Sequence, residues 1–271
     1  MKLMRPQFRW SHFTARPNKR RKARPLVAGL LVTALSLVAF GQACGPSFQI
    51  LDKAARESAS STTLLSPEDR AACAPRSSLP EPTDLTSFVE YLNALPRPVK
   101  LSCIVMNLAG PIELIATHSQ RSAQPASSAR NPRLFIRRGD LLIGIVTSGA
   151  SAALVELGQL LPNTQQSLKA EFVLPIQSDL ISEADGVEHT RLSATGGTSC
   201  GTCHTNETQV TLPSGARAFR SDILRLAAQE EVPLAQIQYE AEECARLNSR
   251  DERCLVYRAL VSSGGLQRRE Y

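Results

Sequence analysis

The chain lacks the short motifs that mark several large enzyme classes. Its 271 residues contain no G-x-x-x-x-G-K-[ST] phosphate loop, no G-x-G-x-x-G dinucleotide fingerprint and no H-E-x-x-H metalloprotease helix. These absences exclude the usual nucleotide sites and the helix-borne zinc protease site. Because no other set of catalytic residues stands out, we predict that the protein is not an enzyme.

Acidic residues are missing from the N-terminus, and charge of either sign is missing from the stretch after it. Residues 1–25 contain nine Lys and Arg residues and no Asp or Glu, and residues 26–44 contain no charged residue. Residues 45–271 contain the other 22 of the 31 basic residues and all 25 acidic residues, so this part of the chain has a net charge of −3. The formal charge of +6 therefore belongs to the N-terminus. We predict no nucleic-acid partner.

The N-terminus has the layout of an export signal. An apolar block of 15 residues at 26–40 follows the basic run and leads into Gly41-Gln42-Ala43. A membrane span needs about 20 apolar residues, so the block favours a signal peptide over residues 1–43, with an uncleaved anchor as the alternative. Cys44 resembles the lipidated cysteine of a bacterial lipobox, and plain cleavage after Ala43 is the other possibility. We expect a bacterial protein that is either periplasmic or anchored to the membrane by this lipid.

The pattern C-G-T-C-H at Cys200–His204 is the most informative motif of the chain. In an exported protein C-x-x-C-H is the attachment signature of c-type haem. Two residues between the cysteines match the separation of the two vinyl groups, and the adjacent His falls beneath the ring. On this motif alone the chain resembles c-type cytochromes. The resemblance implies one haem c, bound through Cys200 and Cys203, with His204 as the proximal iron ligand.

Two other interpretations of these cysteines stay open. Cys200 and Cys203 can form a redox disulfide, although such motifs normally follow a strand and a Trp, which are missing here. They can also belong to a zinc site, for which His189 and another cysteine are the available ligands.

Histidine and methionine are scarce, which leaves few candidates for the sixth iron ligand. Beyond the signal peptide and apart from His204, the chain contains only Met106, His118 and His189. His189 is the nearest imidazole in sequence and is our first choice, because the glycines between it and His204 allow the chain to reverse. Met106 and His118 are alternatives, and an open sixth position is another.

The remaining cysteines fit an oxidising compartment. With Cys44 and the motif set aside, four are left, and they allow three pairings. Cys244 with Cys254 is the natural local pair. Cys73 with Cys103 is then the other disulfide.

The hydrophobic pattern predicts an α+β fold. Residues 44–83 are rich in Ser, Ala, Thr and Pro and are expected to form a tether, unless Cys73 pins part of it to the domain. The domain itself is expected over 84–271 as a β-rich part at 99–175 followed by a haem loop and helices at 176–271. The expected elements are a helix over 84–95, strands at 101–105, 112–117, 134–138, 141–146, 153–157 and 168–174, an irregular stretch at 175–198, and helices with apolar faces at 219–227, 234–247 and 253–261.

Three functional hypotheses follow. The first is a monohaem protein that transfers electrons to or from a redox partner protein. The second is a five-coordinate haem sensor or peroxidase, for which the sequence names no acid–base pair. The third is a structural lipoprotein whose Cys200–Cys203 pair forms a disulfide or a zinc site.

Overall fold

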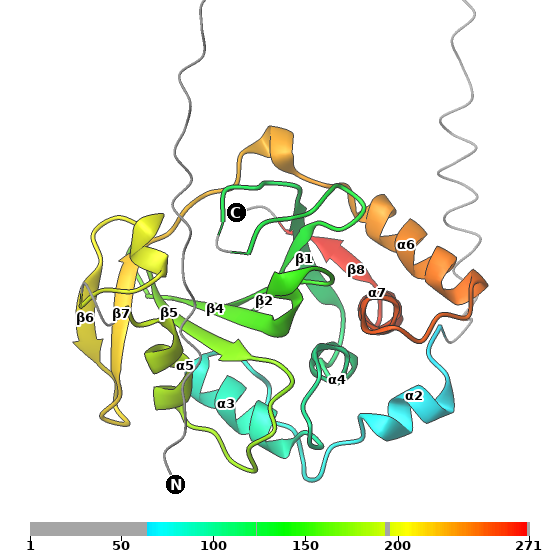
Figure 1. Ribbon diagram of the computed structural model, residues 1–271, viewed down its shortest axis with the longest axis horizontal. Helices are drawn as coiled ribbons and strands as arrows, with labels where there is room; N and C mark the ends of the chain where they lie inside the picture. Colours follow the sequence, from blue (N-terminus) through cyan, green and yellow to red (C-terminus); the bar gives the residue numbers. More distant parts are fainter. Residues whose placement is uncertain (1–63, 123, 193–195, 270–271) are drawn as a thin grey trace, which may run out of the picture. The chain divides into compact units, whose positions relative to one another are not determined.

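One eight-stranded sheet organises the fold (Figure 1). The computed structural model describes residues 64–122, 124–192 and 196–269, so the expected signal peptide and Cys44 lie outside the described residues. Neighbouring strands are antiparallel except for the pair β1–β8, which is parallel. In spatial order the strands are β6 (Thr208–Thr211), β7 (Arg217–Asp222), β5 (Gln166–Val173), β4 (Leu154–Leu160), β3 (Leu141–Val146), β2 (Arg133–Arg138), β1 (Ile112–Thr117) and β8 (Leu266–Arg268).

Residue alternation along the strands gives the sheet one apolar face. Successive side chains of a strand point to opposite sides, so every second residue reaches the same face. The helices α3 (Leu85–Ala94), α4 (Leu101–Met106), α5 (Glu183–Thr190) and α7 (Glu252–Ser262) contribute to the same core, and Figure 1 shows α3, α4 and α5 together on one side of the strands. The buried strand residues of this face include Leu134, Ile136, Ile143, Ile145, Val155, Leu157, Leu168 and Phe172.

The opposite face is built from polar residues and glycine. The pairs Gly144–Glu156, Glu156–Glu171 and Gly158–Lys169 lie side by side in neighbouring strands, so these residues share a face. Arg133 and Phe135 of β2 belong to the same face through the register of β2 with β3. This face lies away from the helical core, and it is where the C-x-x-C-H segment packs.

Several elements confirm the prediction from sequence. The fold is α+β, with α3 at Leu85–Ala94 and the β2–β3 hairpin at Arg133–Arg138 and Leu141–Val146. The C-terminal helices are α6 (Leu234–Arg246) and α7. Both expected disulfides, Cys73–Cys103 and Cys244–Cys254, are present.

Three expected elements were wrong. The apolar run Leu101–Val105 is helix α4, because a short run without periodicity fits a buried helix as well as a strand. The stretch 175–198 contains α5, whose Ser182–Asp185 capping box escaped notice. The expected helix around Phe219–Ala227 is strand β7 up to Asp222, held between β5 and β6.

The segment expected as a tether is described only from residue 64. There it forms helix α2 (Pro67–Ala72), and Asp69 of this helix lies 2.6 Å from Arg250. The disulfide from Cys73 to Cys103 fixes the segment after α2 to the domain, which confirms the alternative prediction that Cys73 pins part of the tether. Among the described helices none is both long and apolar enough to cross a membrane.

Candidate functional site

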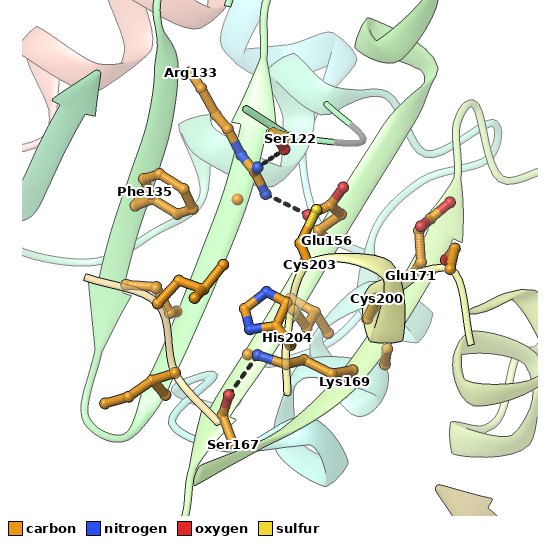
Figure 2. A pocket seen from close by; sticks show the side chains of 18 of the residues that line it. Ser122, Arg133, Phe135, Glu156, Ser167, Lys169, Glu171, Cys200, Cys203 and His204 are labelled. Carbon is orange, nitrogen blue, oxygen red and sulfur yellow. Dashed lines mark hydrogen bonds and ion pairs between the residues drawn. The ribbon is translucent and has the colours of Figure 1, made fainter. Parts of the chain in front are cut away.

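The C-x-x-C-H segment folds back over the polar face of the sheet. After α5 the chain returns toward the helix, and the Ser199 amide donates to the Thr190 carbonyl at 2.8 Å. A 3-10 turn over Cys200–Thr202 follows, closed by a 2.9 Å bond from the His204 amide to the Cys200 carbonyl. This tight turn brings both thiols and the imidazole to one hollow (Figure 2).

Hydrogen bonds to the Glu207 side chain hold this loop in place. Its carboxylate accepts a hydrogen bond from the Thr198 amide at 2.9 Å and another from the Thr198 hydroxyl. Thr198 is buried, and its own hydroxyl accepts the Gly201 amide at 3.2 Å. A Cβ at position 201 would lie 3.0 Å from the carboxylate oxygens, so glycine is what allows this close approach.

The hollow has a volume of about 140 Å³ and a floor made by β3, β4 and β5. Two glycines, Gly144 and Gly158, lie in the floor. A Cβ at Gly144 would come within 3.3 Å of Arg133, whereas a Cβ at Gly158 would make only an ordinary contact, 3.8 Å from Ser167. Part of the lining of the hollow is apolar, and Leu224 in this lining is 47% exposed. The apolar lining residues are Phe135, Leu142, Leu157, Leu160, Ala170, Ile223, Leu224 and Leu226.

His204 is held in one tautomer. Its Nδ1 lies 2.6 Å from the Asp222 carbonyl oxygen, which only accepts hydrogen bonds, so Nδ1 carries the proton. Nε2 is therefore left with its lone pair, as is usual for a metal-binding histidine. Burial, and then the positive charge of Lys169, keep the pKa of His204 below its usual value. The ring is thus a neutral imidazole at neutral pH.

Both motif thiols are free. Cys200 is partly buried, and burial raises the pKa of its thiol, whereas Cys203 is exposed. Neither sulfur is committed to a disulfide, so both are available for covalent attachment of a ligand beside His204.

Charged side chains enter the hollow from the sheet. Arg133 pairs with Glu156, donates to the Ser122 hydroxyl and lies over the Phe135 ring at 4.6 Å (Figure 2). Lys169 is only 7% exposed, and its amine donates to the Ser167 hydroxyl at 2.6 Å. Burial lowers the pKa of Lys169 to about 8.

The other ligand candidates do not line this hollow. His189 is on α5, where its Nδ1 lies 2.9 Å from Glu171, and its side chain is 42% exposed. Burial raises the pKa of Glu171, although His189 opposes this. His118 is exposed just after β1, and Met106 at the end of α4 packs against the helical core.

Sequence reasoning missed the charged residues of the hollow. Glu156, Lys169 and Glu171 alternate with core residues along β4 and β5, and this period of two is a signal that could have found them. The motif also overlaps G-T-S-C-G at 197–201, which fits the G-x-S-x-G pattern of serine hydrolases. That pattern needs a strand before its serine, whereas helix α5 and a loop precede Ser199.

Within the part of the chain that the structure describes, no three His, Cys, Asp or Glu side chains gather as a metal-binding group. A scan against protein-family models, a search of curated proteins and a search of solved structures each found no match.

Proposed function

We propose that this chain is an exported monohaem protein of the c-type cytochrome kind. Cys200 and Cys203 would hold one haem c through thioether bonds, and His204 would be its proximal ligand. The observation that carries the proposal is the His204–Asp222 hydrogen bond, which leaves Nε2 unprotonated in a hollow shared with two free thiols. A redox disulfide would not require a neighbouring imidazole whose Nε2 is held unprotonated.

The residues that line the hollow are of the kinds that contact a porphyrin, and the hollow of about 140 Å³ would have to widen to admit one. Leu142, Leu160 and Leu224 supply the apolar contacts that a flat macrocycle needs, and Gly144 and Gly158 add no side chain to the floor at their own positions. Arg121 is a cation of the lining that can pair with a porphyrin carboxylate. When bound, the haem supplies an iron that changes its oxidation state, and the protein tunes it through ligands and burial.

Electron transfer with a redox partner protein is the role that we propose. Cys203 is exposed, so the ring edge attached to it would lie near the surface, where a partner can approach. Export fits the two disulfides, which persist in oxidising compartments. A lipid on Cys44 would then keep the protein at the membrane, and a periplasmic form without the lipid is the alternative.

A second candidate function is binding of a gas or peroxide. The Arg133–Glu156 pair favours it, because a carboxylate beside a guanidinium can move a proton and stabilise developing charge on a small ligand. This would require an open sixth position on the iron.

Haem staining of the exported protein tests the proposal. The full chain is produced in a bacterial host with cytochrome c maturation, denatured, and stained for haem after electrophoresis. We expect a stained band that is lost in the Cys200→Ser, Cys203→Ser double variant and kept in Thr202→Ala, which alters the motif but no attachment atom. An unstained, correctly exported protein would reject the proposal in favour of a structural lipoprotein with a disulfide or zinc site.

A further inference from the structure

Lys169 is a buried cation that has no carboxylate within ion-pair distance among the described residues, although the charge of Glu156 acts on it. Lys169 is a residue of β5, where it pairs with Gly158 of β4 on one side and with Phe219 of β7 on the other. Only 7% of its surface is exposed. Its amine has three donors, but among the described residues its one hydrogen bond is to the Ser167 hydroxyl, and it forms no ion pair there. Lysine is almost never buried unless paired, so this position calls for a functional explanation.

Lys169 and His204 reach the hollow from different elements, and the charge of Lys169 acts on the imidazole. His204 comes from the loop that covers the hollow, and Lys169 rises from its floor (Figure 2). A haem attached to Cys200 and Cys203 would be bound by His204 from the loop, so the floor of the hollow would lie on the other side of the ring. A side chain of the floor is therefore placed to approach the iron opposite His204.

The alternatives in the hollow are committed or unsuitable. The guanidinium groups of Arg121 and Arg133 stay charged and offer no lone pair. Glu156 is paired with Arg133, and Glu171 with His189. Among the described lining residues, only Lys169 and His204 carry a side-chain nitrogen that can bind iron, and His204 is already the proposed proximal ligand.

We propose that Lys169 is the sixth ligand of the haem iron, bound through Nζ opposite His204. This inference rests on the proposed function. On ligation the ammonium releases one proton to solvent, and the lone pair so exposed forms the bond to iron without any change in oxidation state. The Ser167 hydroxyl accepts a remaining N–H and orients the amine. Two nitrogen ligands from the protein keep the iron six-coordinate, which suits electron transfer and excludes small ligands.

The experiment compares haem-loaded full-length variants by absorption, electron paramagnetic resonance and carbon monoxide binding. Lys169→Arg keeps the positive charge but removes the ligand, Lys169→Ala removes both, and His189→Ala is the matched control. We expect a low-spin ferric signal of amine–imidazole type in the unaltered protein and in His189→Ala. Both Lys169 variants should lose this signal, shift to high spin, and bind carbon monoxide rapidly when reduced.

The outcomes separate this inference from the proposed function. Haem stain in the unaltered protein together with a high-spin or bis-imidazole spectrum overturns the assignment of Lys169 but keeps covalent haem. A low-spin signal that survives in Lys169→Arg does the same. An unstained protein overturns both. Because the spectrum of the unaltered protein already distinguishes an amine from a second imidazole, the inference is decided even if the Lys169 variants fail to fold.

Discussion

Removing the Glu207 carboxylate should open the C-x-x-C-H loop while leaving the sheet intact. In Glu207→Ala the buried Thr198 loses its 2.9 Å amide bond and its hydroxyl bond to the carboxylate. Hydrogen bonds to charged groups contribute about 1.5–3 kcal/mol each, and partial exposure of Glu207 reduces this. We expect the two bonds together to stabilise the closed loop by about 2–4 kcal/mol. At about 1.4 kcal/mol per tenfold change, the open fraction should rise roughly 30- to 700-fold.

Hydrogen–deuterium exchange by mass spectrometry measures this opening. Exchange should accelerate in peptides that contain Thr198 and Gly201 and should stay unchanged in peptides from β3 and β4, which do not depend on Glu207. Glu207→Gln is the matched control, because neutral hydrogen bonds contribute only about 0.5–1.5 kcal/mol each and should give a smaller effect. Unchanged exchange at the loop in Glu207→Ala would refute the reasoning. Equal acceleration throughout the sheet would refute it as well, since Glu207 would then support the whole domain.

Two further predictions concern the framework that carries the loop. Gly186→Ala should destabilise the domain by about 1–2 kcal/mol, because the added Cβ would lie 2.5 Å from Phe172, and overpacking outweighs the gain of about 1 kcal/mol in helix propensity. Urea unfolding measures this, and a stabilised variant would contradict it. Asp69→Asn should flatten the dependence of stability on pH in acid. Burial alone would raise the pKa of Asp69, but bonds from Arg250 and Ser66 lower it below 3.8, so its contribution is present above that pH and is lost as pH falls further. An unchanged acid slope in Asp69→Asn would show that this pair contributes nothing.

Local signals made parts of the fold predictable. Gly139-Asp140 between two apolar runs specifies the β2–β3 hairpin, and Gly139 adopts the positive φ of 57° that such a turn needs. Asp84 caps α3 by accepting the Ser87 amide at 2.7 Å. Leu101–Val105 carried no such signal, because all five side chains are buried and the run has no periodicity to read.

The site could be predicted only where it is contiguous in sequence. Cys200, Cys203 and His204 form a motif. The alternation along β5 could have placed Lys169 on the polar face, but it reaches the same hollow through the register of β4 and β5, which no local pattern specifies. Distance along the chain was a poor guide for His189. It lies fifteen residues before His204, but α5 places it 2.9 Å from Glu171, and His189 itself does not line the hollow.

The polar face of the sheet carries two sets of groups with opposite consequences for the proposed haem. Lys169 on the iron would close the sixth position, and this favours electron transfer. The Arg133–Glu156 pair has no part in electron transfer but would matter for a small ligand. Both sets line one hollow, so loss of the Lys169 amine would leave the pair beside an open position. One side chain of the floor would then decide between the two functional classes, while the loop, both thioethers and His204 stay the same.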